Sequence, residues 1–298
     1  MKSTKIILLA FSLIFFLVVG FAIRVYMMIP DRKELMSCFT TKMYQVKLCP
    51  GGKNYVPLSQ ISKVMQKTVV LTEDSLFYTH KGFDWESIEK SAKENLDGGK
   101  YKRGGSTITQ QLAKNLYLTK DKTLIRKMIE AFITLQIEKH LTKNEILEKY
   151  LNVVEFGKDI YGVKPAAWHY FKKSPSQLDV VESAFLAMLL PNPKKYSRSF
   201  YSKKLTPFAF KRIKRIVSDM YQYNRITEEQ YLTAKEKLKN FYSTPEQVSE
   251  IDSMDAGSDE SADTADDDEA TEDSIDSADQ SDTENDASSG NAVEFDSE

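Results

Sequence analysis

Residues 104–130 constrain the fold most, because they read GGSTITQQLAKNLYLTKDKTLIRKMIE and place polar side chains at helical spacing. Ser106 follows two glycines and predicts the N-cap of a helix that starts at the next residue. After a short break, a second helix is expected, with Lys122, Arg126 and Glu130 four residues apart along one face. Two basic helices meeting in this way would form a pocket of cations and amide donors around one carboxylate, which suits a diphosphate.

The alternative interpretation of this stretch is structural. Basic residues on a helix commonly form a solvated face, and nothing in the spacing alone excludes this. Glu130 fits that interpretation less well, because apolar residues precede and follow it in the sequence KMIEAFI. A carboxylate in such a segment either pairs with Arg126 or takes part in chemistry.

The charge of the chain is divided unevenly. The formal net charge is −2, but residues 251–298 hold 19 of the 43 acidic residues and no Lys or Arg. Residues 1–250 therefore carry 41 basic and 24 acidic residues. The acidic segment has too few large apolar groups to offset chain entropy, so residues 244–298 are expected to be a disordered tail. Such a tail is either a plain solvated segment, a solubilising brush or a mimic of an anionic ligand.

An uncharged apolar run covers Ile6–Ile23, after the short start at residues 1–5. Its length of about 27 Å at 1.5 Å per residue matches the hydrocarbon core of a bilayer. The prediction is an uncleaved transmembrane anchor, with residues 1–5 in the cytoplasm. Because Gly20 and Ala22 form a small-x-small pattern, a cleaved signal peptide is the alternative.

The chain has two cysteines, Cys38 and Cys49, just beyond the apolar run. Residues 24–55 are expected to be a linker. If this side of the membrane is oxidising, the cysteines can form a local disulfide, and the alternative is two unpaired thiols. The histidines have no metal-like spacing to either cysteine, so no zinc site is expected.

The body of the chain, residues 56–243, is predicted to be mostly α-helical. Apolar residues recur at helical spacing in residues 56–72, and a capping box opens a helix at Thr142. No segment alternates convincingly as a strand, and no internal repeat is present.

Two carboxylates of this body, Glu73 and Glu130, have apolar neighbours that would raise the pKa of a carboxyl group. A pair of such carboxylates suggests glycosyl chemistry. A hydrolase needs an acid for a poor sugar leaving group. A transferase with a diphosphate-linked donor instead needs cations on the departing diphosphate and one base for the attacking hydroxyl. The lysines and arginine of residues 114–127 favour the transferase, and a nearby anchor favours a lipid-linked donor.

Four motifs then resemble those of the family 51 peptidoglycan glycosyltransferases, in particular the monofunctional biosynthetic transglycosylases. They are, in order, EDSLFYTHKGFD (73–84), GGSTITQQLAKN (104–115), RKMIEA (126–131) and KNEILEKYLNVVEFG (143–157). The resemblance covers roughly residues 56–197. The cysteine pair and the acidic tail lie outside the family pattern.

The resemblance implies a role for each matching residue. Glu73 would be the general base that deprotonates the acceptor 4-hydroxyl of lipid II, and Glu130 the second essential carboxylate, which positions the donor or helps to hold a divalent cation. The remaining matching residues would contact substrate: Asp74, Ser106, Thr107, Gln111, Lys114, Lys122, Arg126 and Lys127. The implied product is a β-1,4-linked glycan, with release of undecaprenyl diphosphate.

The resemblance also implies a lysozyme-like, mostly α fold with a small membrane-facing jaw lobe. The expected location is the bacterial inner (cytoplasmic) membrane, single-pass, with the catalytic domain on the periplasmic or outer face. The expected partners are lipid II, the growing glycan strand, the membrane and other cell-wall synthesis proteins, with no nucleic acid. No cofactor is required by the sequence, and Mg²⁺ or Mn²⁺ at the diphosphate remains open. The rival functions are a lytic wall-cleaving enzyme and an inactive wall-binding scaffold.

Overall fold

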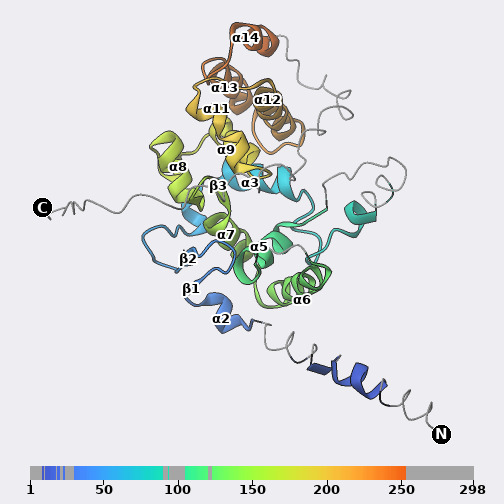
Figure 1. The fold of residues 1–298 in the computed structure, drawn as a ribbon. Coiled ribbons are helices and arrows are strands. Elements are labelled where there is room, and N and C mark those ends of the chain that lie inside the picture. The colour runs from blue at the N-terminus through green and yellow to red at the C-terminus, as the bar shows by residue number, and fades with distance from the viewer. Residues whose placement is uncertain are drawn as a thin grey trace, which may run out of the picture. The chain divides into compact units, whose positions relative to one another are not determined.

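The computed structural model describes residues 9, 11–17, 19–20, 23, 30–89, 93, 105–119 and 123–252. These residues are mostly helical, as the sequence predicts (Figure 1). The α-helices with both ends among the described residues are α2 (Arg32–Met36), α3 (Lys63–Glu73), α5 (Ile108–Tyr117), α6 (Leu124–His140), α7 (Lys143–Val153), α8 (Val163–Phe171), α9 (Val180–Leu189), α10 (Pro193–Tyr196), α11 (Arg198–Tyr201), α12 (Pro207–Gln222), α13 (Glu228–Lys239) and α14 (Pro245–Asp252). The described residues also include two short 3₁₀ turns, η1 (Leu58–Gln60) and η2 (Pro175–Gln177).

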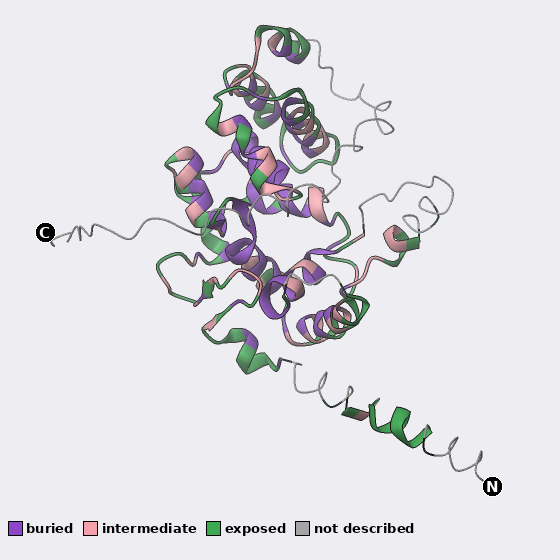
Figure 2. Ribbon diagram, viewed as in Figure 1, coloured by how far each residue is buried: buried purple, intermediate pink, exposed green. Residues whose placement is uncertain are grey.

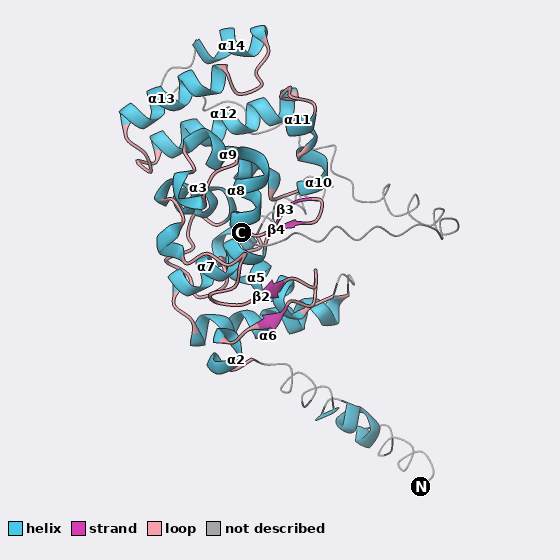
Figure 3. Ribbon diagram, turned by 90° about the vertical axis from the view of Figure 1, so that its left-hand side faces the viewer, coloured by secondary structure: helices cyan, strands magenta, loops and turns pink. Residues whose placement is uncertain are grey.

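Helix α9 is the centre of the core because its sequence, VVESAFLAML, has almost no polar face. All of its residues are buried, which is typical of a helix covered on every side. Helices α3, α12 and α13 pack against it, and Figure 3 shows α9 between α3 and α12. The buried carboxylate of Glu182 is neutralised by Lys173 at 2.6 Å and Lys237 at 2.7 Å.

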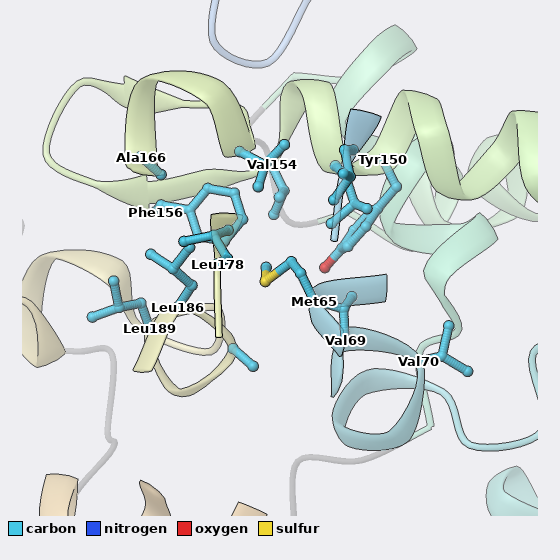
Figure 4. Packing of buried hydrophobic residues seen from close by; sticks show 14 of the residues in the cluster. Met65, Val69, Val70, Tyr150, Val154, Phe156, Ala166, Leu178, Leu186 and Leu189 are labelled. Atoms are coloured by element: carbon cyan, nitrogen blue, oxygen red, sulfur yellow. The ribbon is translucent and has the colours of Figure 1, made fainter. Parts of the chain in front are cut away.

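Helices α5, α6 and α7 form a second group, in which α5 packs against both of the others. Helix α7 also contacts α8, and its buried residues extend the core around α3 and α9 (Figure 4). Within α5, eight of ten residues are buried. The exceptions are Gln111 and Lys114, which lie about 60° apart on the helix and mark its uncovered face.

Two short hairpins were not expected from the sequence. Strand β1 (Phe39–Thr40) pairs antiparallel with β2 (Lys47–Leu48), and β3 (Glu155–Gly157) pairs antiparallel with β4 (Ile160–Tyr161) across a bulge. Strands of two or three residues are too short to show the alternation by which strands are predicted.

The expected linker is in part a folded element, which corrects the prediction for residues 30–55. The β1–β2 hairpin docks on the C-terminal end of α5, where the N–H of Lys42 donates to the carbonyl of Leu116 at 2.9 Å. The ring of Phe39 stacks on that of Tyr117, with centroids 5.9 Å apart. Backbone N–H groups thus satisfy carbonyls that the end of a helix leaves without an intrahelical partner.

Cys38 and Cys49 are disulfide-bonded in the structure, with Cα atoms 4.2 Å apart. The bond closes the β1–β2 hairpin just outside its strands, because Cys38 precedes Phe39 and Cys49 follows Leu48. The cysteine pair therefore belongs to the element that caps α5.

The folded part continues beyond the expected boundary at Thr244. Helix α14 follows it directly, and the side chain of Ile251 is fully buried. The Gln247 amide donates to the carbonyl of Leu205 at 3.3 Å. The predicted boundary was wrong because a short helix next to an acidic segment is hard to recognise from composition. Residues 253–298 lie outside the described residues.

Among the described residues, none of the helices combines the length and apolar character needed to cross a membrane. The predicted anchor, Ile6–Ile23, falls partly outside the described residues.

Candidate active site

Glu73 is the last residue of α3 and is half-buried. The helix begins at the N-cap Ser62, whose hydroxyl accepts the N–H of Met65 at 3.1 Å, and it ends at the C-cap Asp74, whose N–H donates to the carbonyl of Val70 at 3.0 Å. The amide of Gln111 in α5 donates to Oε2 of Glu73 at 3.0 Å. Burial raises the pKa of the Glu73 carboxyl above its ordinary value, and the Gln111 hydrogen bond partly opposes that increase.

Charged groups from three segments also act on Glu73. The positive charges of Arg212 in α12 and Lys114 in α5 lower its pKa, whereas the negative charge of the adjacent Asp74 raises it. The net direction is upward because burial is the largest effect. A half-buried carboxylate with a raised pKa beside cations is suited to act as a general base.

Arg212 was not among the residues predicted for the site. The basic amphipathic character of residues 207–223 is visible in the sequence, but nothing in that pattern indicates which cation faces Glu73. The packing of α12 against both α3 and α9 decides this.

Asp74, expected to contact substrate, is engaged within the protein. Its side chain is 2% exposed and accepts from His80 Nε2 at 2.8 Å and from the backbone N–H of Ile108 at 2.9 Å. Ile108 is the first residue of α5, so the carboxylate sits where the helix N-terminus favours negative charge. Asp74 therefore anchors the start of α5 to the end of α3.

The N-cap of α5 is Thr107, not Ser106 as expected. The Thr107 hydroxyl accepts the N–H of Gln110 at 3.2 Å and donates to the carbonyl of Gly82 at 2.7 Å. The Gln110 side chain returns a bond to the N–H of Thr107 at 3.0 Å, which completes a capping box. This reciprocal bond is available at Thr107 because a Gln lies three residues later. Thr107 is buried, whereas Ser106 is exposed.

Glu130 lies on the buried face of α6, in phase with Ile133 and Ile137. Its ion-pair partner is Lys127, three residues earlier. The expected structural alternative, a pair between Arg126 and Glu130, is not what the described residues form. Arg126 lies on the same side of the helix as Glu130, and its Nε is buried without a hydrogen-bond partner among the described residues.

The structure thus brings Glu73, Gln111, Lys114 and Arg212 together, and places Arg126, Lys127 and Glu130 on the helix that packs beside α5. Lys122 lies outside the described residues. Within the described ranges, no three His, Cys, Asp or Glu side chains are grouped closely enough to hold a metal ion.

Comparison with known proteins gives a consistent result. The model of the family described as Transglycosylase matches residues 43–221, which extends beyond the residues that carried the resemblance. A biosynthetic peptidoglycan transglycosylase of Dechloromonas aromatica is 44% identical over 147 residues, which are 49% of this chain and 64% of that protein. The protein of the same name from Nitrosospira multiformis is 42% identical over 166 residues, or 56% of this chain and 70% of the relative.

A third relative, the biosynthetic peptidoglycan transglycosylase of Herminiimonas arsenicoxydans, is 40% identical over 195 residues, or 64% of this chain and 82% of that protein. The match to the Dechloromonas protein spans slightly less than two thirds of that relative's length. The family match covers more than half of this chain, and it includes α3, α5, α6 and α12, the helices that form the site. The chain belongs to the transglycosylase family.

Proposed function

We propose that the protein is a peptidoglycan glycosyltransferase that polymerises lipid II into β-1,4-linked glycan and releases undecaprenyl diphosphate. The observation that carries this proposal is the setting of Glu73, a half-buried carboxylate with a raised pKa, held by Gln111 and flanked by the charges of Lys114 and Arg212. Glycosyl transfer from a diphosphate-linked donor requires a base for the attacking hydroxyl and cations for the departing diphosphate, and adjoining helices supply both here.

In the proposed reaction, Glu73 accepts the proton of the 4-hydroxyl of the acceptor N-acetylglucosamine. The hydroxyl oxygen attacks C1 of the lipid-linked N-acetylmuramic acid, the bond from C1 to the diphosphate oxygen breaks, and the configuration at C1 is inverted. Lys114, Arg126 and Lys127 stabilise the negative charge that develops on the departing diphosphate, and Glu130 keeps Lys127 in place.

A membrane-facing position for α6 is part of the proposal. Five apolar side chains on α6 are each at least 48% exposed: Leu124, Ile125, Met128, Phe132 and Leu135. At 100° per residue they fall within an arc of about 100°, opposite the buried face of the helix. Figure 2 shows exposed and buried positions side by side along α6. An exposed apolar face of this width is typical of a surface that meets a membrane or a partner.

Because the proposed donor is lipid-linked, we favour the membrane over a protein partner as the surface that contacts the apolar face of α6. The apolar run Ile6–Ile23 would anchor the chain in the inner membrane, with the catalytic domain on the periplasmic or outer face. The same membrane would then hold lipid II, the α6 face and the anchor.

One assay separates this proposal from its two rivals. Purified full-length protein in detergent is incubated with labelled lipid II and, separately, with intact wall sacculi. Polymer from lipid II supports the transferase. Soluble glycan released from sacculi would indicate the lytic enzyme, and no product in either reaction would indicate the scaffold.

A further inference from the structure

Tyr150 lies in α7, and its ring points from that helix toward α3 (Figure 4). The side chain is completely buried. Its hydroxyl donates to Oε1 of Gln111 at 3.0 Å, and Gln111 Nε2 donates to Oε2 of Glu73 at 3.0 Å. Three helices thus contribute one residue each to a single chain of hydrogen bonds.

The direction of this chain depends on the ionisation of Glu73. An ionised carboxylate can only accept, so Gln111 must turn its NH₂ group toward Glu73. The amide oxygen then faces Tyr150, which must donate its hydroxyl proton. The Tyr150 hydroxyl can also accept, but among the described residues the Gln111 amide oxygen is the acceptor for its buried proton, so turning the amide over would leave that donor unpaired. The hydroxyl therefore favours the orientation in which the NH₂ group of Gln111 faces Glu73.

We propose that Tyr150 is a positioning residue for catalysis, which acts through Gln111 to keep Glu73 deprotonated and oriented. The inference rests on the proposed function, because it assigns Glu73 as the base. Without the tyrosine hydroxyl, the amide can turn its oxygen toward Glu73, an arrangement that favours the protonated carboxyl. The base would then be unavailable over part of the working pH range.

The Tyr150→Phe substitution does not change the other charged groups that face Glu73. They are Arg212 from α12, Lys114 from α5 and Asp74 from the end of α3. Arg212 and Lys114 favour the charged carboxylate, and Asp74 opposes it. These groups are the same in parent and variant, so a change in the titration of Glu73 that disappears in the Gln111→Met background is attributable to Gln111.

The test compares full-length parent, Tyr150→Phe, Gln111→Met and the double variant in detergent, with lipid II polymerisation followed across pH. Tyr150→Phe keeps the buried ring. We expect the acidic limb of its kcat/KM profile to move to higher pH by about 0.5–1 unit, a loss of about three- to tenfold below the limb. Activity at high pH should return to within about twofold of the parent. In the Gln111→Met background, Tyr150→Phe should have no further effect beyond about twofold, because Tyr150 acts through Gln111.

Tyr170→Phe is the matched control. Its hydroxyl is also buried but donates to the carbonyl of Phe156 at 2.8 Å, so its loss should leave the pH profile unchanged. An unshifted acidic limb in Tyr150→Phe, or additive losses in the double variant, would overturn the proposal. Either result would mean that the Tyr150 hydroxyl contributes only a structural hydrogen bond within the core.

A second readout does not depend on activity. With ¹³C-labelled glutamate, the carboxyl resonance of Glu73 is assigned by its absence in Glu73→Gln and titrated in parent and Tyr150→Phe. A higher titration midpoint in Tyr150→Phe supports the relay even if the parent fails to polymerise lipid II, a failure that would overturn the proposed function instead. An unchanged midpoint refutes the relay even if polymerisation is normal.

Discussion

Lys127 forms the ion pair with Glu130 in α6, while Arg126 Nε is buried without a hydrogen-bond partner among the described residues. The two cations are adjacent in sequence but have different surroundings. Lys127 compensates a buried carboxylate, and its own side chain is 51% exposed. Arg126 lies on the same side of the helix as Glu130, and under the proposed function its guanidinium would bind the donor diphosphate.

Arg126→Ala should therefore affect turnover more than stability. If the guanidinium stabilises charge in the transition state by about 2–4 kcal/mol, lipid II polymerisation should fall about 30- to 1,000-fold. Arg126→Lys should recover part of this, because a point charge cannot grip two phosphate oxygens. The melting temperature should stay close to that of the parent.

Lys127→Ala is the comparison for Arg126→Ala. It leaves the Glu130 carboxylate buried without its partner, so the free energy of unfolding should fall by about 1–3 kcal/mol. If Arg126→Ala is the less stable variant and its folded fraction polymerises at the parental rate, the proposed role of Arg126 at the diphosphate is wrong.

Glu73→Gln should abolish polymerisation, with a loss of about two to four orders of magnitude expected for removal of a general base. The same variant should be more stable than the parent at neutral pH. Because the folded pKa of Glu73 is raised, its stabilising contribution is complete below the ordinary carboxyl pKa and is lost as pH rises through the raised value.

The stability difference between Glu73→Gln and the parent should accordingly grow with pH, which thermal melts at a series of pH values would measure. At a pH below the ordinary carboxyl range the two proteins should be closest in melting temperature. A variant that retains activity within tenfold of the parent would contradict the assignment of the base.

Arg212→Ala should shift the acidic limb of the activity profile to higher pH, because the Arg212 charge lowers the pKa of Glu73. The matched control is Arg215→Ala in the same helix, whose guanidinium lies 3.7 Å from Asp219 at the surface. Kinetics across pH on both variants would check this. Equal profiles for the two would show that the Arg212 charge has no effect on the base.

Thr107→Ala should lower the free energy of unfolding by about 1 kcal/mol, the usual effect of losing an N-cap. Ser106→Ala, at the adjacent exposed position, should change it by less than about 0.5 kcal/mol. Chemical denaturation of both variants tests the assignment of the cap, and the reverse order of stability would restore Ser106 as the capping residue.

Loss of the Cys38–Cys49 disulfide should destabilise the folded part by about 3 kcal/mol, from the closure of a loop of about a dozen residues. Cys38→Ser with Cys49→Ser tests this by denaturation. Mass spectrometry of non-reduced peptides from protein isolated from its native cells should find the linked pair. Two freely alkylated thiols there would argue against an oxidised hairpin in the cell.

The sequence alone predicted the helical class, and its resemblance to a known family indicated Glu73 as the candidate base. Caps and apolar periodicity depend on residues within about four positions of each other, so the helical class and most helix starts can be predicted from local pattern. The burial of Glu130 also follows from its phase with Ile133 and Ile137. The four ordered motifs indicated Glu73, Lys114 and Arg126 as candidate site residues.

The tertiary structure decided which side chains meet. The bonds from Gln111 to Glu73 and from Tyr150 to Gln111 join residues 38 and 39 positions apart, on three different helices. No local pattern specifies such a pair, because the contact depends on the packing angle and register of helices around the α9 core. The packing of helices also decides that Arg212 faces Glu73. The β1–β2 hairpin was not recognised as a folded element because its contact with the end of α5 likewise depends on tertiary packing.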